Sequence, residues 1–294
     1  MKATLFLMTE KGCHVLQTIV ANDLGSMIDL VVINTDTAVA NDFSTEIKEL
    51  AHKNNIPCQF SSDVTEIQSD YSIAVSWRWL IKESQSQLIV LHDSYLPRYR
   101  GFAPLVNSLI NGESEIGVTA LFASEEYDKG AIINQDKIAI SYPIKIQEAI
   151  EKVAAIYNAL VLDILQKIKN NEDLRAKPQS EELASYSLWR DEEDYFIDWN
   201  QSAETIARFV DAVGFPYTGA KTKMADEVVV INSVSLHDDV TIENRHVGKV
   251  IFLKGEKPVV VCKSGLLVIE DAVYPDTNQS IFPLKKFRIK FKSQ

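Results

Sequence analysis

The sequence predicts an α/β domain built on a largely parallel sheet, followed by a smaller β-rich domain. Three observations lead to this fold class. Short β-rich runs alternate with helical runs up to His92, a pattern typical of βαβ units. A long amphipathic helix follows near the middle of the chain, and β-rich runs separated by turn residues fill most of the remainder. The 294 residues leave room for about two domains.

The first part of the chain supplies the predicted sheet. Strands are expected at 4–8, 28–34, 73–76, 88–92, 117–122 and 132–140, with helices at 13–21 and 44–52. The run IDLVVI is almost continuously apolar, as in a parallel strand that is covered on both faces. Ser44 stands where the N-cap of the second helix is expected.

The middle of the chain carries its clearest helical periodicity. Apolar residues recur every three or four positions between Ile146 and Ile168, which predicts an amphipathic helix that closes one face of the sheet. The polar stretch 169–182 is then predicted to be an interdomain linker. We therefore expect a first domain over 1–183, with the linker from about 169, and a second over 184–294.

The second domain is predicted to be a small barrel or sandwich. One helix is expected at 203–213, N-capped by Ser202. Strands are expected at 228–231, 246–253, 259–262, 266–269 and 287–292.

Charge and cysteine content exclude several classes of function. The formal net charge of −11 repels phosphate backbones, so a general nucleic-acid binder is not expected. The three cysteines, Cys13, Cys58 and Cys262, are far apart and contain no CxxC pair, so buried free thiols are predicted instead of a disulfide framework or a metal site. No signal peptide or membrane span is recognisable, and a cytoplasmic protein without membrane association is expected.

One segment, LHDSYLPRYRGFAP from Leu91, stands apart chemically. Ligands in open α/β sheets collect at the carboxyl ends of strands, where this segment is predicted to begin. His92 is suited to proton transfer near neutral pH, although a histidine at a strand end is more often a structural residue. The residues near His92 favour a functional role.

Those neighbours are arginines and aromatic residues. Arg78, Arg98 and Arg100 are expected at one edge of the sheet, where planar guanidinium groups would bind phosphate or carboxylate. Ion pairs with surface carboxylates are the alternative. Stacking on a flat ring and core packing explain the nearby aromatic residues about equally well; these are Trp77, Trp79, Tyr95 and Tyr99.

The runs HDSYLPRYRGFAP, INGESEIGVT and YDKGAII resemble the folate-dependent formyltransferases. KGC at 11–13, WRWLI at 77–81 and SLWRDEEDYFIDW at 187–199 extend the resemblance over the whole chain. The resemblance implies a Rossmann-like formyltransferase domain followed by an OB-like β-barrel. It also implies a one-carbon transferase of class EC 2.1.2 with N10-formyltetrahydrofolate as cosubstrate, and a cis bond before Pro97.

The catalytic trio of this family is an Asn, a His two residues later and an Asp near a D-x-G sequence. His92 matches the His and Asp128 matches the Asp, but Val90 stands in place of the Asn. This departure removes a donor that could stabilise the developing oxyanion. The hypothesis is that a water, a backbone N–H or a substrate hydroxyl completes the site. His92 is expected either to donate to the oxyanion, oriented by Asp128, or to relay the proton of the amine together with it.

The resemblance also implies two sets of binding residues. The pteridine is expected between the loops 77–81 and 124–128, held largely by backbone groups, and the cofactor set is Trp77, Arg78, Trp79, Leu80, Ile81, Val90, Ser124, Glu125 and Tyr127. The substrate set is Lys11, Gly12, Asp93, Ser94, Arg98, Tyr99 and Arg100. Asp93 is expected either to anchor the sugar or only to cap the following turn. No metal site is expected.

Among the acceptors that the resemblance implies, a nucleotide-linked aminosugar is expected. The tRNA-binding members of the family have a basic insertion in the loop after the second strand, whereas the matching loop here, 34–43, contains no Lys or Arg that could bind a tRNA backbone. The leading hypothesis is a 4-amino-4,6-dideoxyhexose on UDP or dTDP, which would place the protein in surface polysaccharide biosynthesis. A methionyl-tRNA formyltransferase and a non-catalytic relative that binds folate or a sugar nucleotide are the alternatives. A homodimer is compatible with the sequence.

Overall fold

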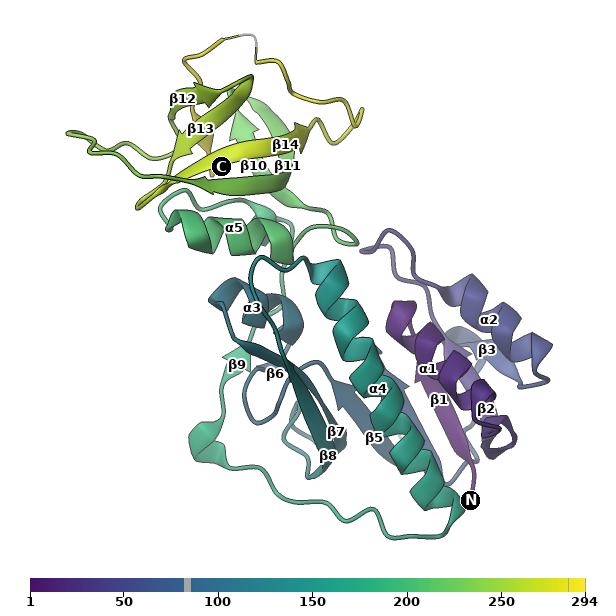
Figure 1. The fold of residues 1–294 in the computed structure, drawn as a ribbon. Coiled ribbons are helices and arrows are strands. Elements are labelled where there is room, and N and C mark those ends of the chain that lie inside the picture. The colour runs from purple at the N-terminus through teal and green to yellow at the C-terminus, as the bar shows by residue number, and fades with distance from the viewer. Residues whose placement is uncertain (82–85, 285, 294) are drawn as a thin grey trace. The chain divides into compact units, whose positions relative to one another are not determined.

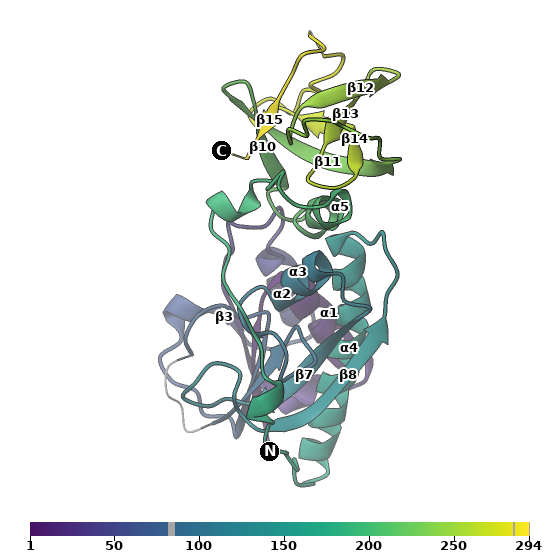
Figure 2. The same cartoon turned by 90° about the vertical axis from the view of Figure 1, so that its left-hand side faces the viewer.

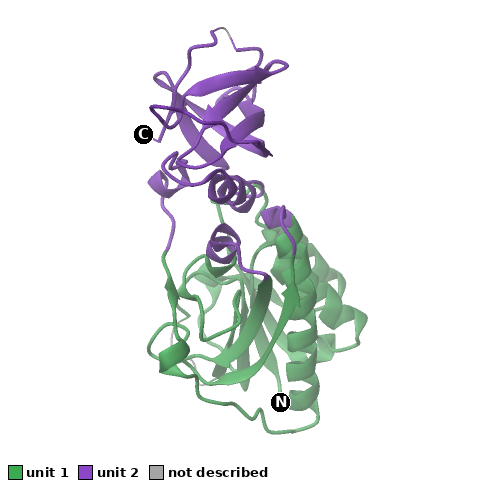
Figure 3. Ribbon diagram, turned by 60° about the vertical axis from the view of Figure 1, so that its left-hand side comes forward, with its two compact units in different colours: residues 1–105, 115–140, 148–188 green, residues 106–114, 141–147, 189–294 purple. Residues whose placement is uncertain are grey.

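The computed structural model describes residues 1–81, 86–284 and 286–293. It forms two compact units, coloured separately in Figure 3. The first contains residues 1–105, 115–140 and 148–188, and the second contains residues 106–114, 141–147 and 189–294. Each unit has its own sheet.

The first unit is built on a seven-stranded sheet in the order β3-β2-β1-β4-β5-β7-β8 (Figure 1). The strands are β1 (Ala3–Leu7), β2 (Ile28–Ile33), β3 (Cys58–Phe60), β4 (Tyr71–Val75), β5 (Gln87–His92), β7 (Glu115–Phe122) and β8 (Ile132–Ala139). The first five run parallel to one another, β7 is antiparallel to β5, and β8 is antiparallel to β7. The order reverses between β1 and β4, which makes their shared edge the topological switch point of the sheet.

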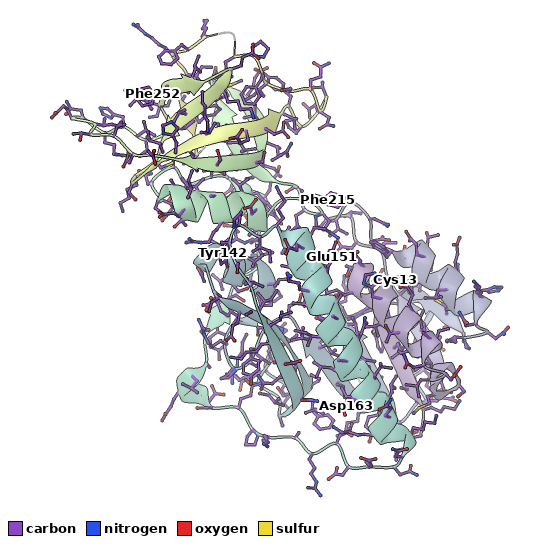
Figure 4. All side chains as sticks on the ribbon, viewed as in Figure 1. Cys13, Tyr142, Glu151, Asp163, Phe215 and Phe252 are labelled. Atoms are coloured by element: carbon purple, nitrogen blue, oxygen red, sulfur yellow. The ribbon has the colours of Figure 1, made fainter. Side chains whose placement is uncertain are left out.

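The helices gather on one face of this sheet, and loops cover the other. The helices are α1 (Thr9–Ala21), α2 (Ser44–Lys53) and α4 (Ile146–Lys169). Asp163 on α4 (Figure 4) accepts a 3.1 Å hydrogen bond from Asn134 Nδ2 on β8. On the opposite face, Phe6 and Ala74 belong to an apolar cluster that is covered by residues of the segments 64–67 and 77–81. The sheet therefore has a helix-covered face and a loop-covered face.

Several predicted elements are confirmed, with small shifts of their ends, and some details are wrong. Ser44 is not the N-cap of α2 but its first residue. Its N–H donates to Asp42 Oδ1 at 2.9 Å, so the Asp42 carboxylate caps this end instead. The three-residue strand β3 was not predicted, because so short a run carries little periodicity.

The predicted linker packs on the first unit. Lys177 and Ile132 exchange two backbone hydrogen bonds of 2.8 Å, and β9 (Tyr186–Ser187) pairs with β6 (Arg100–Gly101). Figure 1 shows the chain leaving the end of α4 and returning along the sheet to β9, and Figure 2 shows the same return from the side.

The second unit contains a curled antiparallel sheet in the order β12-β13-β14-β11-β10-β15. Its strands are β10 (Ala220–Met224), β11 (Glu227–His237), β12 (Val250–Lys254), β13 (Lys257–Val261), β14 (Leu266–Val273) and β15 (Phe291–Lys292). Val250 N donates to Ile289 O at 3.1 Å, and Phe291 N donates to Gly248 O at 2.7 Å. These bonds bring the two edges of the sheet together, as the OB-like prediction requires.

Two helices and a buried tryptophan complete this unit. Residues 106–114 of the second unit include most of α3 (Pro104–Asn111). In α5 (Ala203–Ala212) the predicted cap is confirmed, because Thr205 N donates to Ser202 Oγ at 3.1 Å. Trp199 is almost fully buried, and its indole N–H donates to Thr222 Oγ1 at 3.1 Å. The strand β10 was not predicted, because its sequence AKTKM is mostly polar.

The cysteines are free, as predicted. Cys13 on α1 (Figure 4) and Cys262 are buried, whereas Cys58 is only half-buried. Burial raises the pKa of Cys13, and it raises the pKa of Cys262 to about 12. Neither thiol is therefore suited to act as a nucleophile.

Candidate active site

His92 is the last residue of β5, and its imidazole is 7% exposed. The ring Nε2 lies 2.8 Å from Tyr99 O, and Nδ1 lies 3.5 Å from Asp128 Oδ1. The Tyr99 carbonyl can only accept a hydrogen bond, so it favours the tautomer with the proton on Nε2. In that tautomer the Nδ1 lone pair faces the carboxylate.

The loop that carries Asp128 starts near the end of β5 that lies opposite His92. Because β7 is antiparallel to β5, the loop after β7 begins beside Leu88, where Ala123 N donates to Leu88 O at 2.9 Å. The loop then turns back to place Asp128 at the opposite end of the strand. The structure thus brings together the two residues that the sequence predicts as catalytic.

The backbone around Asp128 is strongly constrained. Asp128 has a φ of +56°, a conformation that non-glycine residues adopt uncommonly. Gly101 N donates to Asp128 Oδ2 at 2.8 Å. A Cβ on Gly130 would lie 1.7 Å from Phe122 O, so the D-x-G sequence needs a glycine at this position. The carboxylate is held with Oδ1 toward His92.

Val90 lies on the loop-covered face of the sheet. It pairs with Ala74, which pairs with Phe6, and the apolar cluster on this face includes all three residues. Strand residues two apart share a face, so His92 also lies on this side. The position of the family Asn is therefore apolar and packed, and the Val90 side chain offers no hydrogen bond to a ligand.

Asp93 points to the helix-covered face. Its Oδ2 forms an ion pair with Lys11 Nζ on α1, and its Oδ1 accepts a 2.7 Å hydrogen bond from the Tyr157 hydroxyl on α4. Burial alone would raise the pKa of Asp93, but Lys11 and the hydrogen bonds lower it below its ordinary value. Both carboxylate oxygens are occupied, so this arrangement does not support the predicted role of Lys11 and Asp93 in binding substrate.

Two more of the predicted substrate residues have structural contacts. A Cβ on Gly12 would lie 3.1 Å from Leu7 Cβ, so this glycine lets α1 approach the end of β1. Ser94 is buried, and its hydroxyl donates to Arg98 O at 2.7 Å. The predicted cis bond is present between Leu96 and Pro97.

The three arginines do not form one anion site. Arg78 Nη1 lies 2.9 Å from Asp36 Oδ2, so its charge is balanced from the loop after β2. Arg100 is fully buried and pairs with Glu181 at 2.9 Å, which does not support its predicted contact with substrate. Arg98 is exposed, and its guanidinium lies 5.3 Å from the centre of the Tyr99 ring. Arg98 and Tyr99 remain the candidates at this edge.

The predicted cofactor residues lie in two loops. The first follows β4, where Trp77 packs edge-on against Phe6 at 5.1 Å and against Trp79 at 5.7 Å. Ile81 is half-buried and Leu80 is 91% exposed. Among the described residues, two buried polar atoms here lack a hydrogen-bond partner, Ser76 Oγ and Trp77 Nε1. Buried groups without partners are uncommon and are expected to bind water or ligand.

The second loop contains Ser124, Glu125 and Tyr127, all of which are exposed. The Ser124 hydroxyl donates to Glu126 O at 2.7 Å. The Tyr127 ring lies 5.8 Å from the ring of Phe102, and these side chains are 73% and 43% exposed. Phe102 is next in the chain to Gly101, which donates to the carboxylate, and Tyr127 is next to Asp128, which carries it.

Sequence reasoning missed the residues that support this site. Thr119 on β7 pairs with His92 on β5, and its hydroxyl donates to Ser94 O at 2.7 Å. Gln179 donates to Asp128 O at 2.6 Å from the stretch predicted as a linker. The sequence carries no local signal for either contact, because both depend on residues distant in the chain.

Profiles of known families decide the assignment of the chain. A profile described as formyl transferase matches residues 9–162, and one described as formyl transferase, C-terminal domain, matches residues 190–279. The chain belongs to the formyl transferase family. This confirms the enzyme class and the Rossmann-like and OB-like architecture that the sequence predicts.

Solved structures of other formyl transferases share this fold. WlaRD, a sugar 3N-formyl transferase solved in the presence of dTDP and 5-N-formyl-THF, is 18% identical, with a TM-score of 0.69 over 97% of this chain and 98% of that chain. The N-formyltransferase from Helicobacter canadensis, in complex with folinic acid and dTDP-3-aminofucose, is 18% identical, with a TM-score of 0.68 over 92% and 98%. The methionyl-tRNA formyltransferase from Clostridium thermocellum is 16% identical, with a TM-score of 0.58 over 81% and 94%.

Among the described residues no cluster of His, Cys, Asp or Glu could hold a metal ion. In the same parts of the chain, no helix has the length and apolar character needed to span a membrane.

Proposed function

We propose that this formyl transferase moves a formyl group from N10-formyltetrahydrofolate to the amino group of a nucleotide-linked aminosugar. The observation that carries the proposal is the pairing of His92 Nδ1 with Asp128 Oδ1 at 3.5 Å. In the family the matching residues are catalytic. The neighbours that hold formyl-folates and dTDP or a dTDP-sugar support the choice of both substrates.

The chemistry requires one proton to leave and another to arrive. The amine nitrogen forms a bond to the formyl carbon, the bond from that carbon to N10 breaks, the amine loses a proton, and N10 gains one. Because Nε2 of His92 is directed at Tyr99 O, the amine proton is proposed to pass to the His92–Asp128 pair on the Nδ1 side of the ring. Asp128 stabilises the imidazolium that results, as a carboxylate beside a histidine does in other proton transfers.

The folate is proposed to bind on the loop-covered face of β5. Trp77 Nε1 and Ser76 Oγ are buried there without partners among the described residues, which fits a ligand with its own donors and acceptors. The Trp77 N–H is also a candidate to replace the missing Asn as a donor near the reacting carbonyl, because Trp77 and Val90 pack against the same apolar cluster.

The acceptor is proposed to lie against the aromatic pair Phe102 and Tyr127. Exposed aromatic faces beside a catalytic carboxylate suit the apolar face of a deoxysugar or a flat base. Exposed Arg98 is the candidate for its diphosphate. The amine is proposed to be on C4 or C3 of a dideoxyhexose linked to UDP or dTDP, and the product would serve surface polysaccharide biosynthesis.

The test is a formyl-transfer assay with N10-formyltetrahydrofolate and a panel of acceptors. The panel contains UDP- and dTDP-linked 3-amino and 4-amino dideoxyhexoses, together with charged methionyl-tRNA. Release of tetrahydrofolate and formylation of a sugar nucleotide, seen by mass spectrometry, are expected. Turnover with methionyl-tRNA alone would overturn the acceptor, and binding of folate and sugar nucleotide without turnover would favour the non-catalytic alternative.

A further inference from the structure

The segment 177–187, which we call the strap, joins the two loops that build the candidate active site. At one end Lys177 pairs with Ile132, just after the Asp128 loop. At the other end Arg100 N donates to Ser185 O at 2.8 Å, and Phe102 N donates to Ser187 O at 3.0 Å. The strap thus contacts the loop that carries Asp128 and the loop that bonds to its carboxylate.

Gln179 is the strap residue whose side chain bonds to the backbone of the Asp128 loop. Its Nε2 donates to Asp128 O at 2.6 Å and to Gly130 O at 2.9 Å. Its Oε1 accepts from Arg100 Nε at 3.0 Å and from Arg100 Nη2 at 2.9 Å. Both hydrogens of the amide nitrogen and the amide oxygen are therefore engaged.

Arg100 fixes the orientation of this amide. A guanidinium group has donors and no acceptor, so the Gln179 oxygen must face Arg100 and the NH2 group must face the two carbonyls. Arg100 is itself held on a second side by Glu181, whose oxygens lie 2.9 Å from Nη1 and Nη2. The guanidinium is fully buried, which leaves it little freedom to turn.

We propose that Gln179, oriented by Arg100, is a positioning residue that holds the Asp128 carboxylate in register with His92. The two bonds from Nε2 reach the carbonyl of Asp128, which has the positive φ, and the carbonyl of Gly130 two residues later. They fix the direction in which the Asp128 side chain leaves the backbone. This inference rests on the proposed function, because it assigns Gln179 a role through Asp128.

The alternative is that Gln179 only fastens the strap to the rest of the unit. If Gln179 were purely structural, its loss would lower the stability of the protein. The loss would then reduce activity by a similar factor in the wild-type enzyme and in the Asp128→Asn variant. A residue that acts through Asp128 has no further effect on the chemical step once the carboxylate is gone, because double-mutant cycles show coupling only between residues that act together.

The experiment combines Gln179→Met with Asp128→Asn and measures kcat, KM for both substrates and the unfolding midpoint. Gln179→Met keeps the side-chain length and removes the hydrogen bonds. It is expected to lower kcat about 10- to 100-fold with both KM values little changed, and to have almost no effect in the Asp128→Asn background. Glu182→Gln, an exposed change in the same strap, is the control and is expected to keep wild-type kinetics.

Gln179→Glu provides a second variant if Gln179→Met does not fold. It retains an oxygen for Arg100 and loses the donors to the Asp128 and Gly130 carbonyls, and the same loss of kcat is expected. An equal loss from either Gln179 variant in wild-type and Asp128→Asn backgrounds would overturn the positioning role. Wild-type activity of both variants would overturn it as well. Full activity of Asp128→Asn would instead reject the catalytic assignment under the proposed function.

Discussion

His92 and Asp93 are neighbours in the chain, yet their side chains lie on opposite faces of the sheet. His92 contacts Tyr99 and Asp128 on the loop-covered side, whereas Asp93 contacts Lys11 and Tyr157 on the helix-covered side. The end of one strand thus carries two polar clusters with separate tasks. One cluster is proposed for proton transfer, and the other ties α1 and α4 to β5.

The His92 cluster is expected to control turnover. His92→Asn removes the base, and Asp128→Asn removes the charge that stabilises the imidazolium, so each change should lower kcat at least about 100-fold. The assay is tetrahydrofolate release with the best acceptor of the panel. Near-normal turnover of either variant would remove that residue from the mechanism.

The Asp93 cluster is expected to control stability. Lys11→Met leaves the Asp93 carboxylate without its cation, and this should lower the free energy of unfolding by about 2–3 kcal/mol. That figure lies below the range for fully buried pairs because the Asp93 side chain is 19% exposed. Urea unfolding measures the change, with Lys53→Met on the exposed end of α2 as the control. Equal stability of the two variants would contradict the structural role.

Acid is expected to remove the contribution of Asp93. Its pKa is lowered in the folded protein because Lys11 and the hydrogen bonds outweigh the effect of burial. The unfolded state therefore binds the proton first as the pH falls, and the stabilisation, complete above the unfolded value, is lost as the pH drops through the folded value. The difference in unfolding free energy between wild type and Asp93→Asn should shrink between about pH 5 and the acid limit of folding. A difference that stays constant over this range would show that Asp93 has an ordinary pKa.

Restoring the family Asn at position 90 is expected to bring little gain in activity. Val90 belongs to the apolar cluster with Phe6 and Ala74, and burying an amide there without a partner should lower the free energy of unfolding by about 1–3 kcal/mol. Comparison of kcat and thermal unfolding for Val90→Asn tests this. A marked rise in kcat would mean that the missing donor limits the wild-type enzyme.

The aromatic pair beside Asp128 is expected to affect acceptor binding. Tyr127→Ala should raise the KM for the acceptor about tenfold and change kcat little, because the ring would contact the ground state and the transition state alike. Tyr95→Ala is the matched comparison, since Tyr95 is 44% exposed and its ring lies 5.2 Å from Lys137 Nζ. If Tyr95→Ala raises the KM for the acceptor and Tyr127→Ala does not, the acceptor contacts Tyr95 and the proposed site at Tyr127 is wrong.

Local pattern predicted much of the fold. The apolar runs of β1, β2 and β5 and the three- and four-residue spacing of α4 reflect burial of one face or both faces, and such burial is written into consecutive residues. The motif around His92 and Asp128 also pointed to the two residues that the structure places 3.5 Å apart. The family profiles then confirmed the assignment.

The roles of individual polar residues were harder to predict, because a side chain pairs with whatever the fold brings to it. Arg100, Lys11 and Asp93 have the composition of a substrate site, and each is occupied by a partner far along the chain. The stretch 169–182 has the composition of a linker, yet Gln179 within it bonds to the Asp128 loop. The composition of a segment indicates how readily its side chains stay in water. It does not identify the protein group that takes the place of water when a side chain is buried.

By itself the sequence predicted most strands of the first unit, the enzyme class and the pairing of His92 with Asp128, since periodicity and motif are properties of neighbouring residues. Only the tertiary structure decided which face of β5 each side chain occupies, which arginines are already paired, and that the strap holds the Asp128 loop. Those facts depend on contacts between distant segments, and such contacts become specific only when the whole chain has folded.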